Sequence, residues 1–247
     1  MKIFSYALVF CCLVATQGFA QEMHSDVEFG YEGGSLIFES DITGIDAAGV
    51  FEAEFEVFNM DGTQEAEDPG FASNFTEGDE TFMVTSGDDI FVNVNQSATL
   101  GSFLTYYNPV TGQFESTSAT MTIEDNSPQM TGGTLDLIVS ESGLIGDTSQ
   151  YVDTSDGGEF DSHVDFILSS GAANGAYGLL INIESSNASG DLTNGTTSEN
   201  FWIVFNNGLT EEVFEASVDQ FATAIPEPSA VAILLVSSLA LARRNRK

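Results

Sequence analysis

The 247-residue chain has very few basic side chains, with five Lys and Arg against 38 Asp and Glu. All five basic residues lie near the two ends, so no Lys or Arg occurs between Gln21 and Ile225. The carboxylates of that interval therefore cannot form a salt bridge with Lys or Arg. Nucleic acids and anionic lipids are also poor partners for this surface, because no positive charge would offset their repulsion.

Cysteine is equally scarce. The two cysteines of the chain are Cys11 and Cys12. Both lie in the apolar segment Ile3–Val14, which follows Lys2. Small residues after that segment suit cleavage before Gln21, and this order is typical of a secretory signal peptide. We therefore expect an exported mature protein without cysteine, which excludes disulfides, Cys-ligated metals and Cys nucleophiles.

Three features follow one another at the C-terminus. The motif Pro226, Glu227 and Pro228 precedes an apolar stretch at 230–242, and the basic residues Arg243, Arg244, Arg246 and Lys247 come last. Thirteen helical residues reach about 20 Å, less than the ~30 Å hydrocarbon core of a bilayer. The basic end is typical of a stop-transfer signal, so we expect a short transmembrane helix with the acidic body outside the cytoplasm.

This tail resembles the PEP-CTERM sorting signal of Gram-negative bacteria, in which the same three parts occur in the same order. The resemblance implies processing by an exosortase, a membrane cysteine protease that cuts near the Pro-Glu-Pro and releases or transfers the body to the cell surface. It also implies a location in the cell envelope, on the outer surface or in the extracellular matrix. Extracellular polysaccharide is then a candidate partner.

Alternation of apolar and polar residues predicts strands through most of the body. Residues 26–32 alternate in this way, and residues 51–58 place apolar side chains on one face and acids on the other. Further strands are expected at 36–39, 81–85, 90–95, 103–107, 119–124, 134–139, 163–168, 177–184 and 201–206. Many short strands separated by Gly-rich turns indicate an antiparallel β-sandwich or a barrel-like domain.

One segment near the end of the body has helical spacing instead. Within 210–221, the apolar residues that recur near this spacing are Val213, Phe214, Val218 and Phe221. Two glutamates stand in the first turn, where the helix dipole favours them. We expect this single helix to pack on the strand at 201–205, which is apolar on both faces and therefore central in its sheet.

The sequence shows no repeat and no Pro- or Ser-rich linker within the body. We therefore expect three parts, namely a signal peptide at 1–20, one acidic all-β domain at 21–224 and the sorting tail at 225–247.

The body is also similar to the ectodomains of other PEP-CTERM proteins. The similarity lies in His24–Phe29, Gly175–Leu180 and Phe201–Leu209. Since no activity is tied to that group, the similarity implies a shared fold and no particular reaction.

Two His-x-Asp pairs are the first candidates for metal binding. His24 with Asp26, and His163 with Asp165, each stand at the start of an expected strand. Residues i and i+2 of a strand share one face, so each pair can offer an imidazole and a carboxylate to one ion. Two such pairs on neighbouring strands would form a site with two His and two Asp ligands. The alternative is that both histidines are ordinary surface residues.

The second candidate is an acidic segment with two glycines, whose acids are Asp153, Asp156, Glu159 and Asp161. Oxygen ligands around a tight turn suit Ca²⁺, although the spacing does not match an EF-hand. A weaker cluster consists of Asp61, Glu65, Glu67 and Asp68. The alternative for both is a solvated surface in a chain that is acidic throughout. A divalent cation, calcium or zinc, is the cofactor that these patterns suggest.

Signals for catalysis are weak. The chain has no G-x-S-x-G motif, and Ser155 stands where an aspartic-protease motif needs glycine. The single tryptophan, Trp202, lies in an apolar strand and is expected in the core rather than as a platform for sugars. The sequence therefore predicts a surface protein with a structural or interaction role and no enzyme activity. A metal- or carbohydrate-binding module and a carboxylate hydrolase are the alternatives.

Overall fold

A computed structural model describes residues 26–32, 35–38, 49–55, 57–73, 75–77, 80–125, 136–146, 149–186 and 196–224. The predicted signal peptide, His24 and the predicted sorting tail lie outside these residues. The described chain is mainly β, with one helix, α1 (Glu211–Thr223). The strands are β1 (Val27–Glu32), β2 (Ser35–Phe38), β3 (Val50–Glu54), β4 (Val57–Phe58), β5 (Gln64–Ala66), β6 (Phe71–Ser73), β7 (Phe75–Glu77), β8 (Glu80–Phe82), β9 (Asp89–Asn95), β10 (Leu104–Asn108), β11 (Gln113–Glu115), β12 (Thr120–Asp125), β13 (Leu137–Ser140), β14 (Gly143–Ile145), β15 (Ser149–Thr154), β16 (Phe160–Ser162), β17 (Val164–Leu168), β18 (Gly175–Ser186), β19 (Thr196–Thr197) and β20 (Phe201–Asn207).

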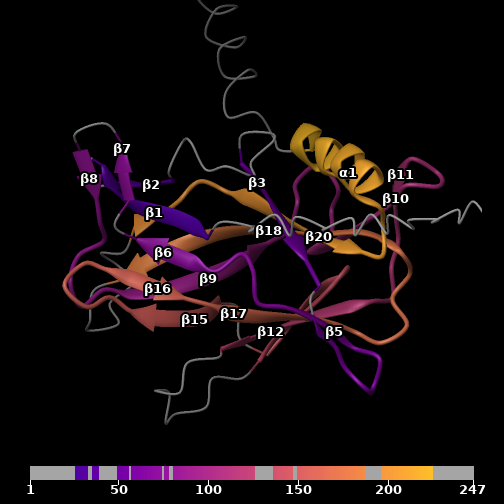
Figure 1. The fold of residues 1–247 in the computed structure, drawn as a ribbon, viewed down its shortest axis with the longest axis horizontal. Helices are drawn as coiled ribbons and strands as arrows, with labels where there is room; N and C mark the ends of the chain where they lie inside the picture. The colour runs from indigo at the N-terminus through magenta and orange to yellow at the C-terminus, as the bar shows by residue number, and fades with distance from the viewer. Residues whose placement is uncertain are drawn as a thin grey trace, which may run out of the picture.

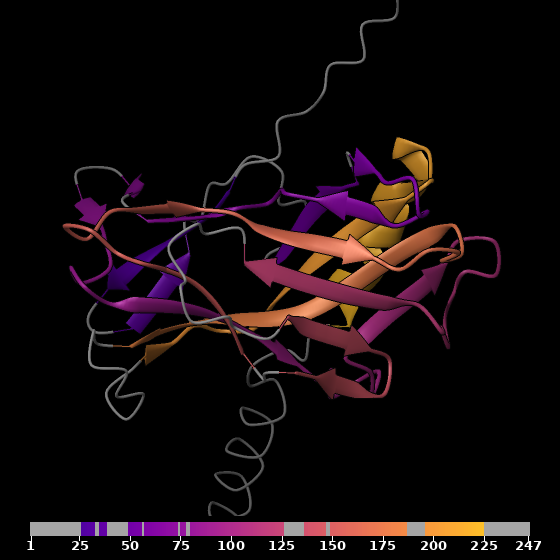
Figure 2. The ribbon, with the colours of Figure 1, turned by 90° about the horizontal axis from the view of Figure 1, so that it is seen from below.

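Three sheets enclose the main core (Figure 1). The largest has eight strands. Five of them follow the order β11-β10-β18-β20-β3. In addition, β9 and β19 pair with β18, and β15 pairs with β9. The other two have the orders β14-β13-β12-β17-β5-β4 and β16-β6-β1-β2, and β7 and β8 form a separate hairpin. One cluster of buried side chains draws on all three sheets, which is consistent with a β-sandwich (Figure 2).

Pairing between the strands is mainly antiparallel, as the alternation pattern predicts. Strand β9 shows this pattern most clearly, because buried and half-buried residues alternate along its whole length. Two pairs are parallel, β1 with β6 and β20 with β3, and for these pairs the expected antiparallel arrangement is wrong. Each parallel pair joins strands that are far apart in the chain, and such strands need no hairpin turn between them.

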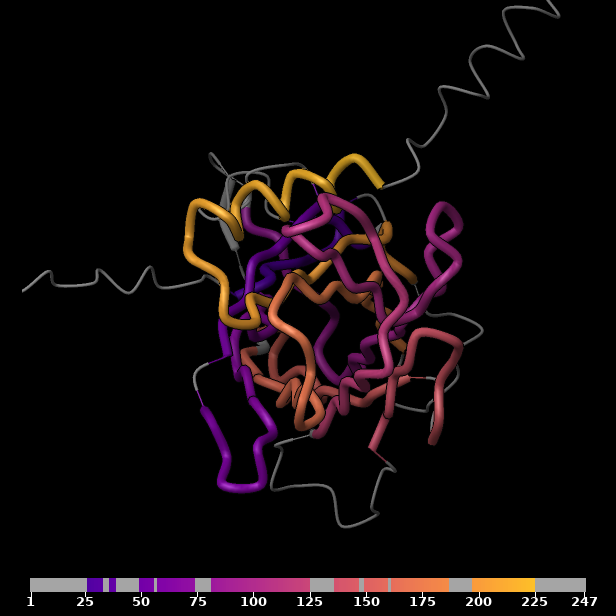
Figure 3. The backbone as a smooth tube through the Cα atoms, turned by 90° about the vertical axis from the view of Figure 1, so that its right-hand side faces the viewer, coloured from indigo at the N-terminus to yellow at the C-terminus, as the bar shows by residue number. Residues whose placement is uncertain are grey.

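Helix α1 covers the outer face of the eight-stranded sheet, as expected (Figure 3). Phe214, Val218 and Phe221 pack in a second buried cluster with Trp202 of β20. Every residue of β20 is buried between β18 and β3, which confirms a central strand. A Cβ atom at Gly178 of β18 would overlap the Phe221 ring, so glycine at this position allows the helix to dock closely.

Three predicted segments differ from the structure. Of the expected strand at 81–85, only residues 81 and 82 lie in a strand, β8. The expected strand at 51–58 is divided into β3 and β4, which belong to different sheets, because the chain crosses between the layers at the buried Phe55. The expected acidic loop at 153–161 consists of the end of β15, a tight turn and strand β16. Positive φ angles at Gly157 and Gly158 allow that turn.

Within the described ranges, no helix has the length and apolar character needed to cross a membrane. The apolar stretch at 230–242 lies outside those ranges.

Candidate functional site

A break in a strand ladder creates the candidate site. On one side of the sandwich, β5 pairs with β17 and β6 pairs with β16. Because β6 follows β5 in the chain and β17 follows β16, the two ladders lie one after the other along the same two segments. Between these ladders, the four residues 67–70 face the three residues 163–165. The extra residue interrupts the ladder in the manner of a bulge, which can redirect side chains.

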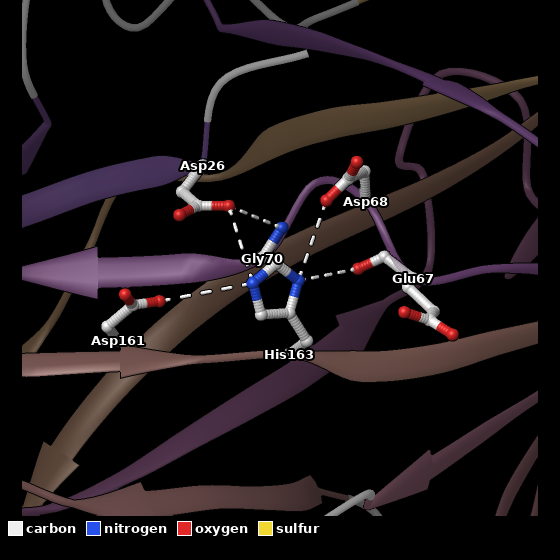
Figure 4. Close-up of polar contacts among 6 residues, drawn as sticks. All are labelled: Asp26, Glu67, Asp68, Gly70, Asp161 and His163. Carbon is white, nitrogen blue, oxygen red and sulfur yellow. Dashed lines mark hydrogen bonds and ion pairs between the residues drawn. The ribbon is translucent and has the colours of Figure 1, made fainter. Parts of the chain in front are cut away.

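Three side chains, those of Asp26, Asp161 and His163, meet at this break (Figure 4). Asp26 directly precedes β1, and the next N–H, that of Val27, donates to the carbonyl of Gly70 at 2.9 Å. Asp161 lies in β16, two residues before His163, and the two share a face of the chain. Because Val27 and its neighbours in β6 point into the core, Asp26 is directed outward toward His163.

The His163 imidazole lies at the centre of this cluster (Figure 4). Its Nδ1 is 3.0 Å from the backbone carbonyl oxygen of Glu67 and 3.5 Å from Asp68 Oδ1. Its Nε2 is 4.0 Å from Asp26 Oδ1 and 3.9 Å from Asp161 Oδ1. A carbonyl oxygen can only accept, so Nδ1 carries the proton, and in the neutral ring the Nε2 lone pair faces the two carboxylates.

The electrostatics of the cluster follow from its composition. Burial lowers the pKa of His163, but the Glu67 carbonyl and the carboxylates of Asp26, Asp68 and Asp161 outweigh this and raise the pKa above its usual value. Burial raises the pKa of Asp26, opposed by His163 and by the Gly70 N–H. His163 is the only basic side chain among the described residues, so only a proton or a bound cation can balance these acids.

The structure thus brings together two residues of the predicted His/Asp set and one residue of the acidic segment. Ligand atoms of Asp26, Asp161 and His163 all lie within 4.8 Å of one another. Asp165 lies elsewhere, in a second group with Glu65 and Glu67. The reason is that Asp165 belongs to β17, beside β5, whereas His163 stands in the link between β16 and β17.

The remaining predicted ligands take part in local hydrogen bonds. Asp153 Oδ1 accepts from the Thr154 N–H at 2.7 Å. Asp156 and Glu159 close the turn before β16 through two backbone hydrogen bonds of 3.1 and 3.2 Å. These three acids belong to neither group in the part of the chain that the structure describes. From the acidic segment, only Asp161 joins His163.

Gly70 also belongs to the site, although the sequence patterns did not indicate it. A Cβ atom at this position would lie 2.6 Å from His163 Cε1 and 2.7 Å from Asp26 Oδ1, so glycine is needed for the close approach. The Gly70 N–H also donates to Asp26 Oδ1 at 3.1 Å. The Pro-Gly pair at this point is a turn signal, but it does not indicate a site by itself.

A separate recess of about 210 Å³ lies between the β11–β12 and β17–β18 connections. Residues 116–119 and 169–173, most of them small or hydroxylated, line it together with Tyr106. The Tyr106 hydroxyl donates to the Asn174 carbonyl at 2.9 Å. No carboxylate occurs among these described lining residues, so the recess lacks the paired acids of a glycosidase.

Comparison with known proteins gives no family. No protein-family model matches the chain, and no curated protein matches it. Among solved structures, the chain is similar to the ASH/PapD-like domain of human CEP192 (PapD-like domain 7), with 10% sequence identity and a TM-score of 0.22. That match covers 65% of this chain and 82% of the other. At this score the likeness is too distant to assign a fold family.

Proposed function

We propose that the protein is an exported, exosortase-processed component of the cell surface or extracellular matrix, with a structural or interaction role and no catalytic activity. The supporting observation is the position of the fold in the chain. Helix α1 ends at Thr223 with its C-cap at Ala224, and the Pro-Glu-Pro motif begins two residues later at Pro226. A cut at this motif therefore removes the tail and leaves the described sandwich and α1 intact.

The location of the polar and aromatic groups supports a passive role. Trp202 has no exposed surface, so it is a core residue and cannot act as a platform for a sugar ring. Before processing, the apolar stretch at 230–242 and its basic end hold the acidic body at the membrane. After processing, the body carries its 37 acids between Gln21 and Ile225 without a Lys or Arg, and mutual repulsion limits its self-association.

Binding of extracellular polysaccharide is a second candidate role, favoured by the hydroxyl-rich recess beside Tyr106. Hydroxyl side chains can exchange hydrogen bonds with sugar hydroxyls. Because the body is strongly acidic, a neutral polymer suits it better than a uronic-acid polymer. Retention on a neutral polysaccharide column, but not on an anionic one, is the expected result, and passage through both columns would contradict this role.

Mass spectrometry of the protein from fractions of the native host tests the main proposal. We expect a surface or matrix protein that begins at Gln21 and ends near Pro226–Pro228. A variant with alanine at all three positions of the motif should keep its tail and stay with the membrane. Surface protein that still carries Arg243–Lys247 would contradict processing, and cytoplasmic protein that begins at Met1 would contradict export.

A further inference from the structure

We propose that Asp26, Asp161 and His163 bind one divalent transition-metal ion of the zinc type at the break in the ladder. This inference goes beyond the surface role and does not depend on it. It rests on the geometry of three donor atoms, on the groups that orient them and on the charge around them.

The three donor atoms all lie within 4.8 Å of one another, so small side-chain rotations can bring them onto one ion. His163 Nε2 is 4.0 Å from Asp26 Oδ1 and 3.9 Å from Asp161 Oδ1. Two metal–ligand bonds of about 2.1 Å span at most about 4.2 Å, so one ion can contact both atoms of either pair. Because the Asp161 side chain is 76% exposed, it has room to rotate. Rotation can bring its Oδ1 to roughly 3.4 Å from His163 Nε2, the ligand–ligand separation of a tetrahedral site.

Neighbouring backbone groups orient two of the ligands. The Glu67 carbonyl oxygen lies 3.0 Å from His163 Nδ1 and leaves Nε2 available to an ion. A histidine ligand commonly donates its other N–H to a carbonyl in this way, which fixes both the tautomer and the ring. The Gly70 N–H holds Asp26 Oδ1 at 3.1 Å, and the missing Cβ of Gly70 leaves room for both side chains.

The donor set favours zinc over calcium. An imidazole nitrogen with two carboxylates suits Zn²⁺ and related ions, whereas Ca²⁺ takes six to eight oxygen ligands. Two carboxylates balance one divalent charge, and no Lys or Arg in the body competes for them. Three protein ligands leave a position for water. The oxygen-only group of Glu65, Glu67 and Asp165 suits calcium instead, and its acids alone do not support a site.

Metal titration of the purified full chain tests the site. After treatment with a chelator, the protein is titrated with ZnCl₂ or CaCl₂ at constant ionic strength, and binding and melting temperature are measured. We expect zinc at a hundredfold excess over Kd to raise the melting temperature by roughly 5 °C or more. His163→Ala should bind zinc at least about tenfold more weakly.

Two further variants control for effects on folding. Asp161→Asn preserves the size of an exposed side chain and should also weaken zinc binding, with an unchanged melting temperature in chelator. Asp153→Asn removes one acid outside the cluster and should bind zinc like the unaltered protein. Equal zinc affinity in all four proteins, or no zinc binding at all, would overturn the proposal.

Discussion

At the scale of single residues, Gly70 determines whether the cluster can form. A Cβ atom there would lie 2.6 Å from the His163 ring and 2.7 Å from the Asp26 carboxylate. We predict that Gly70→Ala lowers the free energy of unfolding by about 1–3 kcal/mol, as overpacking does, and weakens zinc binding as well. Denaturant unfolding and zinc titration measure the two effects. Gly143→Ala is the control, because nothing lies within 4 Å of its added Cβ, and equal behaviour of the two variants would contradict the prediction.

Tyr177 should make the fold sensitive to alkaline pH. It has no exposed surface, and burial raises its pKa to about 12. An unfolded tyrosine titrates near pH 10, so the folded state binds this proton more tightly. The resulting stability is complete below about pH 10 and is lost as the pH rises through about 12, by roughly 2–3 kcal/mol.

Tyr177→Phe cannot ionise, so its free energy of unfolding should change less between about pH 10 and 12 than that of the unaltered protein. Urea unfolding at a series of alkaline pH values measures this difference. At neutral pH the variant should lose about 1 kcal/mol, because the hydrogen bond from the Tyr177 hydroxyl to the Ala173 carbonyl is removed. The same decline between about pH 10 and 12 in both proteins would assign the effect to other groups.

The sequence patterns singled out all three residues of the cluster, but they assigned Asp161 to the acidic segment and not to the His-x-Asp pairs. The His-x-Asp pattern joined His163 with Asp165, whereas the structure places Asp161 beside His163. Spacing within a strand predicts which residues share a face, but it does not predict which neighbouring strand lies next to them. Asp26 reaches His163 because β1 pairs in parallel with β6, and this pairing joins strands that are far apart in the chain.

At the scale of elements, the docking of α1 depends on one glycine in β18. A Cβ at Gly178 would overlap the Phe221 ring, so we predict that Gly178→Ala lowers the free energy of unfolding by about 1–3 kcal/mol. Phe221→Ala should cost about 3–5 kcal/mol through the cavity that it creates. The double variant should lose less unfolding free energy than the two single variants lose together, because the methyl added at Gly178 enters the space vacated by the Phe221 ring. A double-mutant cycle of unfolding free energies measures this coupling, and strict additivity would contradict a direct contact.

Several long elements were predicted from the sequence, whereas the short strands beside the candidate site were not, and neither was the six-residue β15. Strands β9 and β20 and helix α1 carry enough apolar residues to show their period, and the structure confirms them. Strands β5, β6 and β16 have three residues each, which is too short to show a period. They exist because they pair with neighbours, and the candidate site lies where those short ladders meet.

At the scale of the whole molecule, the charge should make stability dependent on salt. The body between Gln21 and Ile225 holds 37 acids and no Lys or Arg, so folding brings like charges together. We predict a higher melting temperature in saline than in dilute buffer at neutral pH, because salt screens this repulsion. Calorimetry at several NaCl concentrations measures the effect, which should shrink at acidic pH as carboxylates become protonated. A melting temperature that does not rise with salt would show that the acids are already spaced or neutralised.

The parallel pair of β3 with β20 also constrains the order of events during folding. Val50 of β3 lies opposite Trp202 of β20, so the largest sheet cannot be completed until most of the body has been synthesised. Pairing between such distant segments is slow, because a long loop must close before the contact forms. Under the proposed export, this delay would keep β3 without its β20 partner while the rest of the chain emerges. The topology of the sandwich would thus help to keep the chain competent for translocation until its last strand has left the ribosome.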